Sequence, residues 1–297
     1  LFNAKTGREL VSVSLGNPAA LSPDGEFAAG GVLTSGKEKK AALRVVSTKS
    51  GEEYGTIPVK EGTISAIAFS PDSKVVAVGV DYRKHLGGRR LELEYSIAWI
   101  DLKEKKVIRI VKAHKEGVTS LAYTPDGKTL VSASRDSLIH LWDVSTGERK
   151  KSIKNHKHYV TIAVSRDGRF IVSGGFDGQL QVVDIEGALE PVTLQSRHHG
   201  SLDHDIENVA ISPDGALVAT AEWNRGGRLW DVKKKKVIAT LPDGWIRTVA
   251  FAPDGKQLFA GGDRDGVVRV YDVPLLKDQV HVKGHRSKVS KLAFSPS

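Results

Sequence analysis

Short runs of alternating hydrophobic and polar residues fill this chain, and each run ends at a turn signal. Residues 113–154 give the clearest example, because apolar and polar positions alternate there as in half-buried strands. Pro125, Asp126 and Gly127 separate the first two runs and provide the chemistry of a tight turn. The stretch predicts four short antiparallel strands, near residues 118–123, 129–134, 138–142 and 150–154.

The turn between the first two strands recurs along the whole chain as an apolar residue followed by Ser-Pro-Asp-Gly-Lys or a close variant. Copies begin at Leu21, Phe69, Tyr123, Val164, Ile211, Phe251 and, cut short, Phe294. A period of roughly 40–50 residues with strand-turn-strand patterning is a signature of β-propellers. The sequence therefore predicts an all-β fold, a seven-bladed β-propeller of four-stranded antiparallel blades.

A Trp-Asp pair closes the third strand of the clearest unit. The pair Trp142-Asp143 recurs as Trp230-Asp231 and degenerates to Tyr271-Asp272 and Val183-Asp184. With these pairs the chain resembles the WD-repeat β-propeller family, and its degenerate turns resemble those of bacterial members. The resemblance implies a structural network within a blade, formed by His114, Ser132, Asp136 and Trp142. The other units match this network only in part.

The repeat predicts a single domain over residues 1–297. Its expected blades are 18–59, 63–111, 114–154, 156–195, 206–241 and 245–282, with a closing blade from 284–297 plus 1–15. The closing blade is incomplete, because its second strand and most of its third are absent. We therefore expect the chain to be part of a longer polypeptide.

Composition narrows the chemistry. The chain has no Cys, which excludes disulfides, thiolate metal sites and Cys nucleophiles. No apolar stretch approaches the ~20 residues that span a bilayer, and we expect a cytoplasmic protein. The net charge is +9, but Lys and Arg are scattered apart from short runs at 103–106, 149–151 and 233–236. These runs are read either as solvated turns or as contacts for an acidic partner, whereas dispersed charge disfavours nucleic-acid binding.

Three insertions relative to the compact unit point to one rim. Residues 33–41 and 82–93 lengthen the turn between second and third strands, and residues 186–205 lengthen a connection between blades. In a four-stranded blade these segments emerge on the same side. They are either tolerated drift in loop length or a shared recognition face.

The same rim is predicted to carry anchor side chains. In the resembled family, the residue before the Asp of the second turn points toward the channel mouth, and here such residues are large or basic. The predicted partner-binding residues are Arg135, Phe176, Trp223 and Arg264, with Trp245, Tyr82 and Arg83 beside them. The alternative for Phe176 and Trp223 is packing against a neighbouring blade.

Catalytic and metal chemistry find little support. The one local cluster of imidazoles and carboxylates, at His198, His199, Asp203, His204 and Asp205, matches no ligand spacing. We expect neither a metal nor a cofactor. The predicted function is a non-catalytic scaffold for a protein or peptide partner, including another domain of the same polypeptide. The alternative is a propeller enzyme, of hydrolase or lactonase type, with a site at the central channel.

Overall fold

The computed structural model describes residues 15–34, 40–85, 91–154, 156, 159–195, 205–222, 226–241, 246–262, 266–273, 278–283, 289 and 291–294. Within these residues the regular secondary structure consists of twenty-four β-strands in six four-stranded antiparallel sheets. The prediction of an all-β fold built from such sheets is confirmed. In the same residues, no helix is long and apolar enough to cross a membrane.

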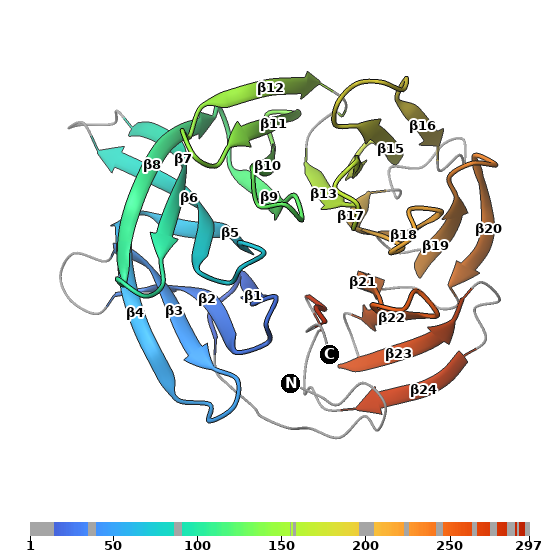
Figure 1. Ribbon diagram of the computed structural model, residues 1–297, viewed down its shortest axis with the longest axis horizontal. Helices are drawn as coiled ribbons and strands as arrows, with labels where there is room; N and C mark the ends of the chain where they lie inside the picture. Colours follow the sequence, from blue (N-terminus) through green and yellow to red (C-terminus); the bar gives the residue numbers. More distant parts are fainter. Residues whose placement is uncertain are drawn as a thin grey trace. The chain divides into compact units, whose positions relative to one another are not determined.

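The chain divides into two compact units, and the described residues up to Lys154 form the first. Its sheets follow one another along the chain, coloured from blue to green in Figure 1. The first sheet contains β1 (Ala19–Leu21), β2 (Phe27–Leu33), β3 (Lys40–Ser47) and β4 (Glu53–Glu61). The second contains β5 (Thr63–Phe69), β6 (Val75–His85), β7 (Leu91–Asp101) and β8 (Lys106–His114). The third contains β9 (Val118–Tyr123), β10 (Thr129–Ser134), β11 (Leu138–Asp143) and β12 (Arg149–Lys154).

The described residues from His156 onward form the second unit, with three sheets of the same design. The fourth sheet contains β13 (Val160–Val164), β14 (Phe170–Gly175), β15 (Gln179–Asp184) and β16 (Val192–Gln195). The fifth contains β17 (Ile206–Ile211), β18 (Leu217–Glu222), β19 (Gly226–Asp231) and β20 (Lys236–Leu241). The sixth contains β21 (Ile246–Phe251), β22 (Gln257–Gly262), β23 (Val267–Asp272) and β24 (Asp278–Lys283).

The recurring Ser-Pro-Asp-Gly turn is stabilised by its own side chains. The Ser22 hydroxyl donates to Asp24 Oδ1 (2.6 Å) and accepts from the backbone N–H of Phe27 (2.9 Å). Gly25 has a φ of 73°, a left-handed conformation that glycine adopts without a steric penalty. Equivalent hydroxyl–carboxylate pairs join Ser70 to Asp72, Thr124 to Asp126, Ser165 to Asp167 and Ser212 to Asp214. The repeat seen in the sequence is therefore a self-contained hairpin between first and second strands.

Consecutive sheets within each unit pack face to face through apolar side chains. In the first unit, one cluster joins the first and second sheets and another joins the second and third. In the second unit, corresponding clusters join the fourth sheet to the fifth and the fifth to the sixth. The aromatic residues that close third strands are buried in these clusters, at Trp99, Trp142, Trp230 and Tyr271.

The insertion predicted at residues 82–93 is not simply a lengthened loop. Its two sides are β-strands, because Tyr82 pairs with Glu94 and His85 with Leu91. Strand β6 therefore includes the first four residues of the predicted loop, 82–85, and β7 includes its last three, 91–93. The insertion at 33–41 is likewise shortened, since Leu33 pairs with Ala41. The expectation that 186–205 is one connection between blades was wrong, because residues 192–195 form β16 and pair with β15. Residues 186–191 therefore lie in the turn between β15 and β16, at the end of β15 opposite to the turn that carries Phe176.

The blade count of seven stays a prediction. Six sheets are described, and the closing blade expected from 284–297 and 1–15 lies almost wholly outside the described residues. The predicted boundary between the second and third blades also shifts. His114 is the last residue of β8 in the second sheet, although its side chain is paired with Ser132 of the third sheet.

Candidate functional site

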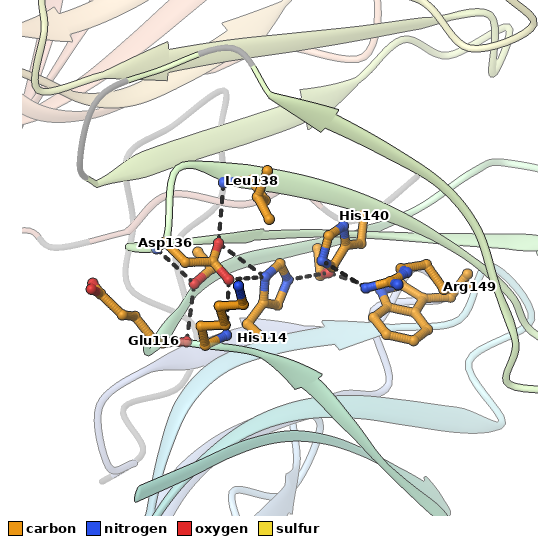
Figure 2. Close-up of polar contacts among 10 residues, drawn as sticks. His114, Glu116, Asp136, Leu138, His140 and Arg149 are labelled. Atoms are coloured by element: carbon orange, nitrogen blue, oxygen red, sulfur yellow. Dashed lines mark hydrogen bonds and ion pairs between the residues drawn. The ribbon is translucent and has the colours of Figure 1, made fainter.

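Four buried side chains of the first unit form a continuous hydrogen-bonded chain. His114 Nδ1 lies 3.2 and 3.1 Å from the two carboxylate oxygens of Asp136, and its Nε2 lies 2.8 Å from Ser132 Oγ. Trp142 Nε1 donates to the same Ser132 oxygen at 2.8 Å. Figure 2 shows the imidazole of His114 between Asp136 and His140. The structure thus brings together all four residues predicted for the network.

The bonding partners of His114 determine its orientation. The carboxylate of Asp136 accepts from Nδ1–H, and Nε2 is paired with the hydroxyl of Ser132. Burial opposes ionisation of Asp136, but hydrogen bonds from His114 and from the backbone N–H groups of Lys115 and Leu138 outweigh it. Together they lower the pKa of Asp136 to about 2. The carboxylate of Asp136 is therefore ionised at pH 7.

A second histidine, which sequence reasoning did not single out, extends the network. The His140 ring stacks on His114 with centroids 4.3 Å apart and an interplanar angle of 7°. Its Nε2 lies 3.4 Å from Arg149 Nη1. Burial, together with the neighbouring His114 and Arg149, lowers the pKa of His140 to about 4. The side chain is therefore neutral at pH 7.

The second unit contains a related network that the sequence analysis also missed. His156 Nδ1 lies 3.2 Å from Asp177 Oδ1, and its Nε2 lies 2.8 Å from Ser173 Oγ. Val183 stands where the first network has Trp142, so this chain ends at the serine. The signal was available, because His156 precedes Ser173 and Asp177 at nearly the spacing of the first network.

In the fifth sheet a carboxylate accepts from the buried hydroxyl next to the Trp. Trp230 Nε1 donates to Thr220 Oγ1 (3.2 Å), whose hydroxyl donates to Glu222 (2.8 Å). Arg228 lies 3.5 Å from the other carboxylate oxygen of Glu222, and both side chains are largely buried. Each of these three sheets thus contains a buried polar network, and their members differ.

The networks fix the turns that carry two predicted rim residues. Asp136 is held by His114, and Arg135 immediately before it donates its backbone N–H to Gly117 O (3.0 Å). The Arg135 side chain is exposed. In the second unit Phe176 stands in the same relation to its network and donates its N–H to Tyr159 O (3.2 Å). In both units a rigid turn therefore presents a side chain to solvent.

Phe176 is partly packed and partly exposed. Its ring stacks on that of Tyr159, with centroids 4.6 Å apart, yet 40% of the residue stays accessible. Its packing partner precedes β13 of the same sheet, so the contact is not the packing against a neighbouring blade that the alternative predicted. An aromatic ring that is oriented by a neighbour and still exposed loses little conformational freedom on binding.

The remaining rim residues are less fully described. Tyr82 is half-buried beneath the ammonium group of Lys60, which lies 4.6 Å from its ring centroid. Arg83 lies in β6, paired with Leu93. Trp223, Trp245 and Arg264 lie outside the described residues.

The Ser132–His114–Asp136 trio is not placed for nucleophilic catalysis. Ser132 is fully buried, and its oxygen is engaged by both Trp142 and His114, so no substrate can reach it as a nucleophile. No group of three or more His, Asp or Glu side chains in the described ranges is placed to hold a metal ion. Of the histidine–aspartate cluster around 198–205, only Asp205 is described.

Comparison with protein families gives an independent result. A family model described as "WD domain, G-beta repeat" matches residues 105–143, 147–184, 192–231 and 235–272, together just over half of the chain. The third and fourth of these segments end at Trp230-Asp231 and Tyr271-Asp272, and the first ends at Trp142-Asp143.

Individual relatives match at lower coverage of their own length. Nuclear distribution protein PAC1 of Arthroderma otae is 29% identical over 67% of this chain and 50% of that protein. Nuclear distribution protein nudF of Emericella nidulans is 29% identical over 84% of this chain and 62% of that protein. Apoptotic protease-activating factor 1 of Rattus norvegicus is 28% identical over 78% of this chain and 17% of that protein.

The chain spans about half the length of the first curated relatives that it matches. These relatives are eukaryotic proteins, so the expectation of bacterial-type repeats, which rested on the degenerate turns alone, was wrong.

Proposed function

The chain belongs to the WD-repeat family, and on that premise we propose that it is a non-catalytic protein-interaction domain. Its binding surface is the rim that carries Arg135 and Phe176, together with Trp223 and Arg264. The partner is a protein or peptide, including another domain of the same polypeptide. The cytoplasmic location stays a prediction from the sequence.

One observation carries this proposal. In each unit a buried His–Asp pair is used to immobilise a turn, and the residue next to that Asp is exposed: Arg135 in one unit, Phe176 in the other. Arginine and aromatic residues dominate the binding energy of protein interfaces when they are pre-oriented and then desolvated. A buried polar network that holds a turn with an exposed Arg or Phe in place supports a role in partner recognition rather than in catalysis.

The experiment is affinity capture of partners by the whole chain, compared with a variant in which all four rim residues are replaced by Ala. A control variant removes two basic and two apolar exposed side chains elsewhere, at Lys49, Lys74, Leu189 and Val237, also by Ala. Bound proteins are quantified by mass spectrometry, and the melting temperature of each variant is measured.

We expect one set of proteins to be retained by the native chain and by the control, and lost with the rim variant at an unchanged melting temperature. Equal retention by all three would refute the assignment of the rim. A large fall in melting temperature of the rim variant alone would show that these residues are packing residues.

A further inference from the structure

The fourth strands of the second and third sheets, β8 and β12, are unusually basic. Strand β8 contains three Lys or Arg residues and β12 contains four, and neither contains Asp or Glu. The fourth strands of the other sheets contain at most one Lys, and β4 and β24 also carry carboxylates. The basic residues are therefore concentrated on one part of the first unit.

Strand β8 contacts the turn that precedes β12. Arg109 of β8 donates from Nη1 to Val144 O (2.8 Å) and from Nη2 to Ser145 O (2.7 Å), on the turn that leads into β12. Both strands are the last of their sheets and so have one unpaired edge (Figure 1). We call these two strands together the β8–β12 surface.

Exposed hydrophobic residues lie among the cations. Ile108 is 51% accessible and Ile110 41%, between the exposed lysines Lys106 and Lys112. Lysines on an edge strand discourage pairing with another chain, but exposed isoleucines between them do not serve that purpose. Apolar side chains framed by charges of one sign are typical of a binding surface.

We propose that the β8–β12 surface binds an acidic protein segment that carries aliphatic side chains. Carboxylates of the segment pair with the exposed lysines Lys106, Lys112, Lys151 and Lys154, and its aliphatic groups cover Ile108 and Ile110. A nucleic acid fits less well, because neither strand offers an aromatic side chain on which a base could stack. This surface goes beyond the rim assigned above and uses none of its residues.

The probe is a fluorescein-labelled twelve-residue peptide of alternating Glu and Leu, and its binding to the whole chain is followed by fluorescence anisotropy. One variant replaces Lys106, Lys112, Lys151 and Lys154 by Gln. A control variant of identical net charge replaces the exposed lysines Lys49, Lys74, Lys128 and Lys256 by Gln.

We expect the first variant to bind the peptide about tenfold more weakly and the control less than about threefold more weakly, because exposed ion pairs are individually weak. The double variant Ile108→Ser and Ile110→Ser should weaken binding at least about threefold. A peptide with Gln in place of Glu should not bind. The variant with Arg135 and Phe176 replaced by Ala should bind normally, which separates this proposal from the rim.

Equal losses in both lysine variants would overturn the proposal, because binding would then reflect net charge alone. Tighter binding of a single-stranded oligonucleotide, or of vesicles containing anionic lipid, would assign the surface to another class of partner. If the native chain does not bind the peptide and the first variant self-associates, the proposal is overturned. The lysines would then serve only to prevent pairing of the exposed strand edges with another chain.

Discussion

Replacement of Ser132 by Ala removes the oxygen at the centre of the first network. This hydroxyl is fully buried, accepts from Trp142 Nε1 and donates to His114 Nε2, both at 2.8 Å. The alanine leaves one buried donor and one buried acceptor without this partner. The matched change is Ser173→Ala in the second unit, which orphans only His156 Nε2.

The magnitude follows from the number of groups left unpaired. Each buried polar group that loses its partner costs about 1–3 kcal/mol. We therefore expect Ser132→Ala to lower the free energy of unfolding by about 3 kcal/mol and Ser173→Ala by about half of that. Ser152→Ala, at an exposed position of β12, should change it by less than about 0.5 kcal/mol.

The assay is urea unfolding followed by far-UV circular dichroism, with the indole fluorescence recorded in parallel. The three variants and the native chain are compared in the same buffer at pH 7. A loss for Ser132→Ala no larger than that for Ser173→Ala would refute the reasoning. It would mean that the bond from Trp142 adds nothing to the stability of the sheet.

Three further perturbations test other parts of the account. Burial lowers the pKa of His140 to about 4, so the unfolded chain takes up the proton first as the pH falls. About 3 kcal/mol of stability is therefore lost between pH ~6.5 and ~4. The variant His140→Phe should show a smaller change of the urea midpoint across that pH range. Ser73 has a φ of 60°, and its hydroxyl accepts from the backbone N–H of Asp24. Ser73→Gly loses this bond but relieves the backbone strain, so its free energy of unfolding in thermal melts should stay within about 0.5 kcal/mol of the native value. Ser73→Ala loses the bond without relieving strain and should lower it by about 1 kcal/mol. A Cβ added at Gly79 would lie 2.8 Å from Val118 Cβ, so Gly79→Ala should cost about 1–3 kcal/mol by urea unfolding.

The strands and turns were predictable because their signals are local. Hydrophobic alternation and the Ser-Pro-Asp-Gly turn both act within ten residues, and the turn is closed by its own hydroxyl and carboxylate, as at Ser22 and Asp24. The first network was predicted because the resemblance to WD-repeat proteins implies it at these four residues. In contrast, the length of β6 and β7 depends on pairing across the insertion, which a loop reading of Tyr82 to Leu93 did not consider.

The sequence analysis missed residues whose role depends on a contact made only in the fold, or on a repeat in which a member of the network is exchanged. His140 acts through stacking on His114, a contact that its strand pattern does not reveal. The second network lacks the Trp that drew attention to the first. In the fifth sheet the hydroxyl of Thr220 is paired with the carboxylate of Glu222, which has no counterpart in the first network. The resemblance to bacterial repeats failed because turn sequences of this kind report local geometry rather than ancestry.

The most direct test of the central claim is photo-crosslinking from single positions. Benzoylphenylalanine is incorporated at Phe176, on the predicted rim, or at Leu189, which is 52% accessible and lies in the turn at the opposite end of β15. Each labelled chain is irradiated with the partner proteins captured by the native chain. The account predicts that position 176 crosslinks a partner and position 189 does not. Crosslinking from position 189 with none from position 176 would contradict it.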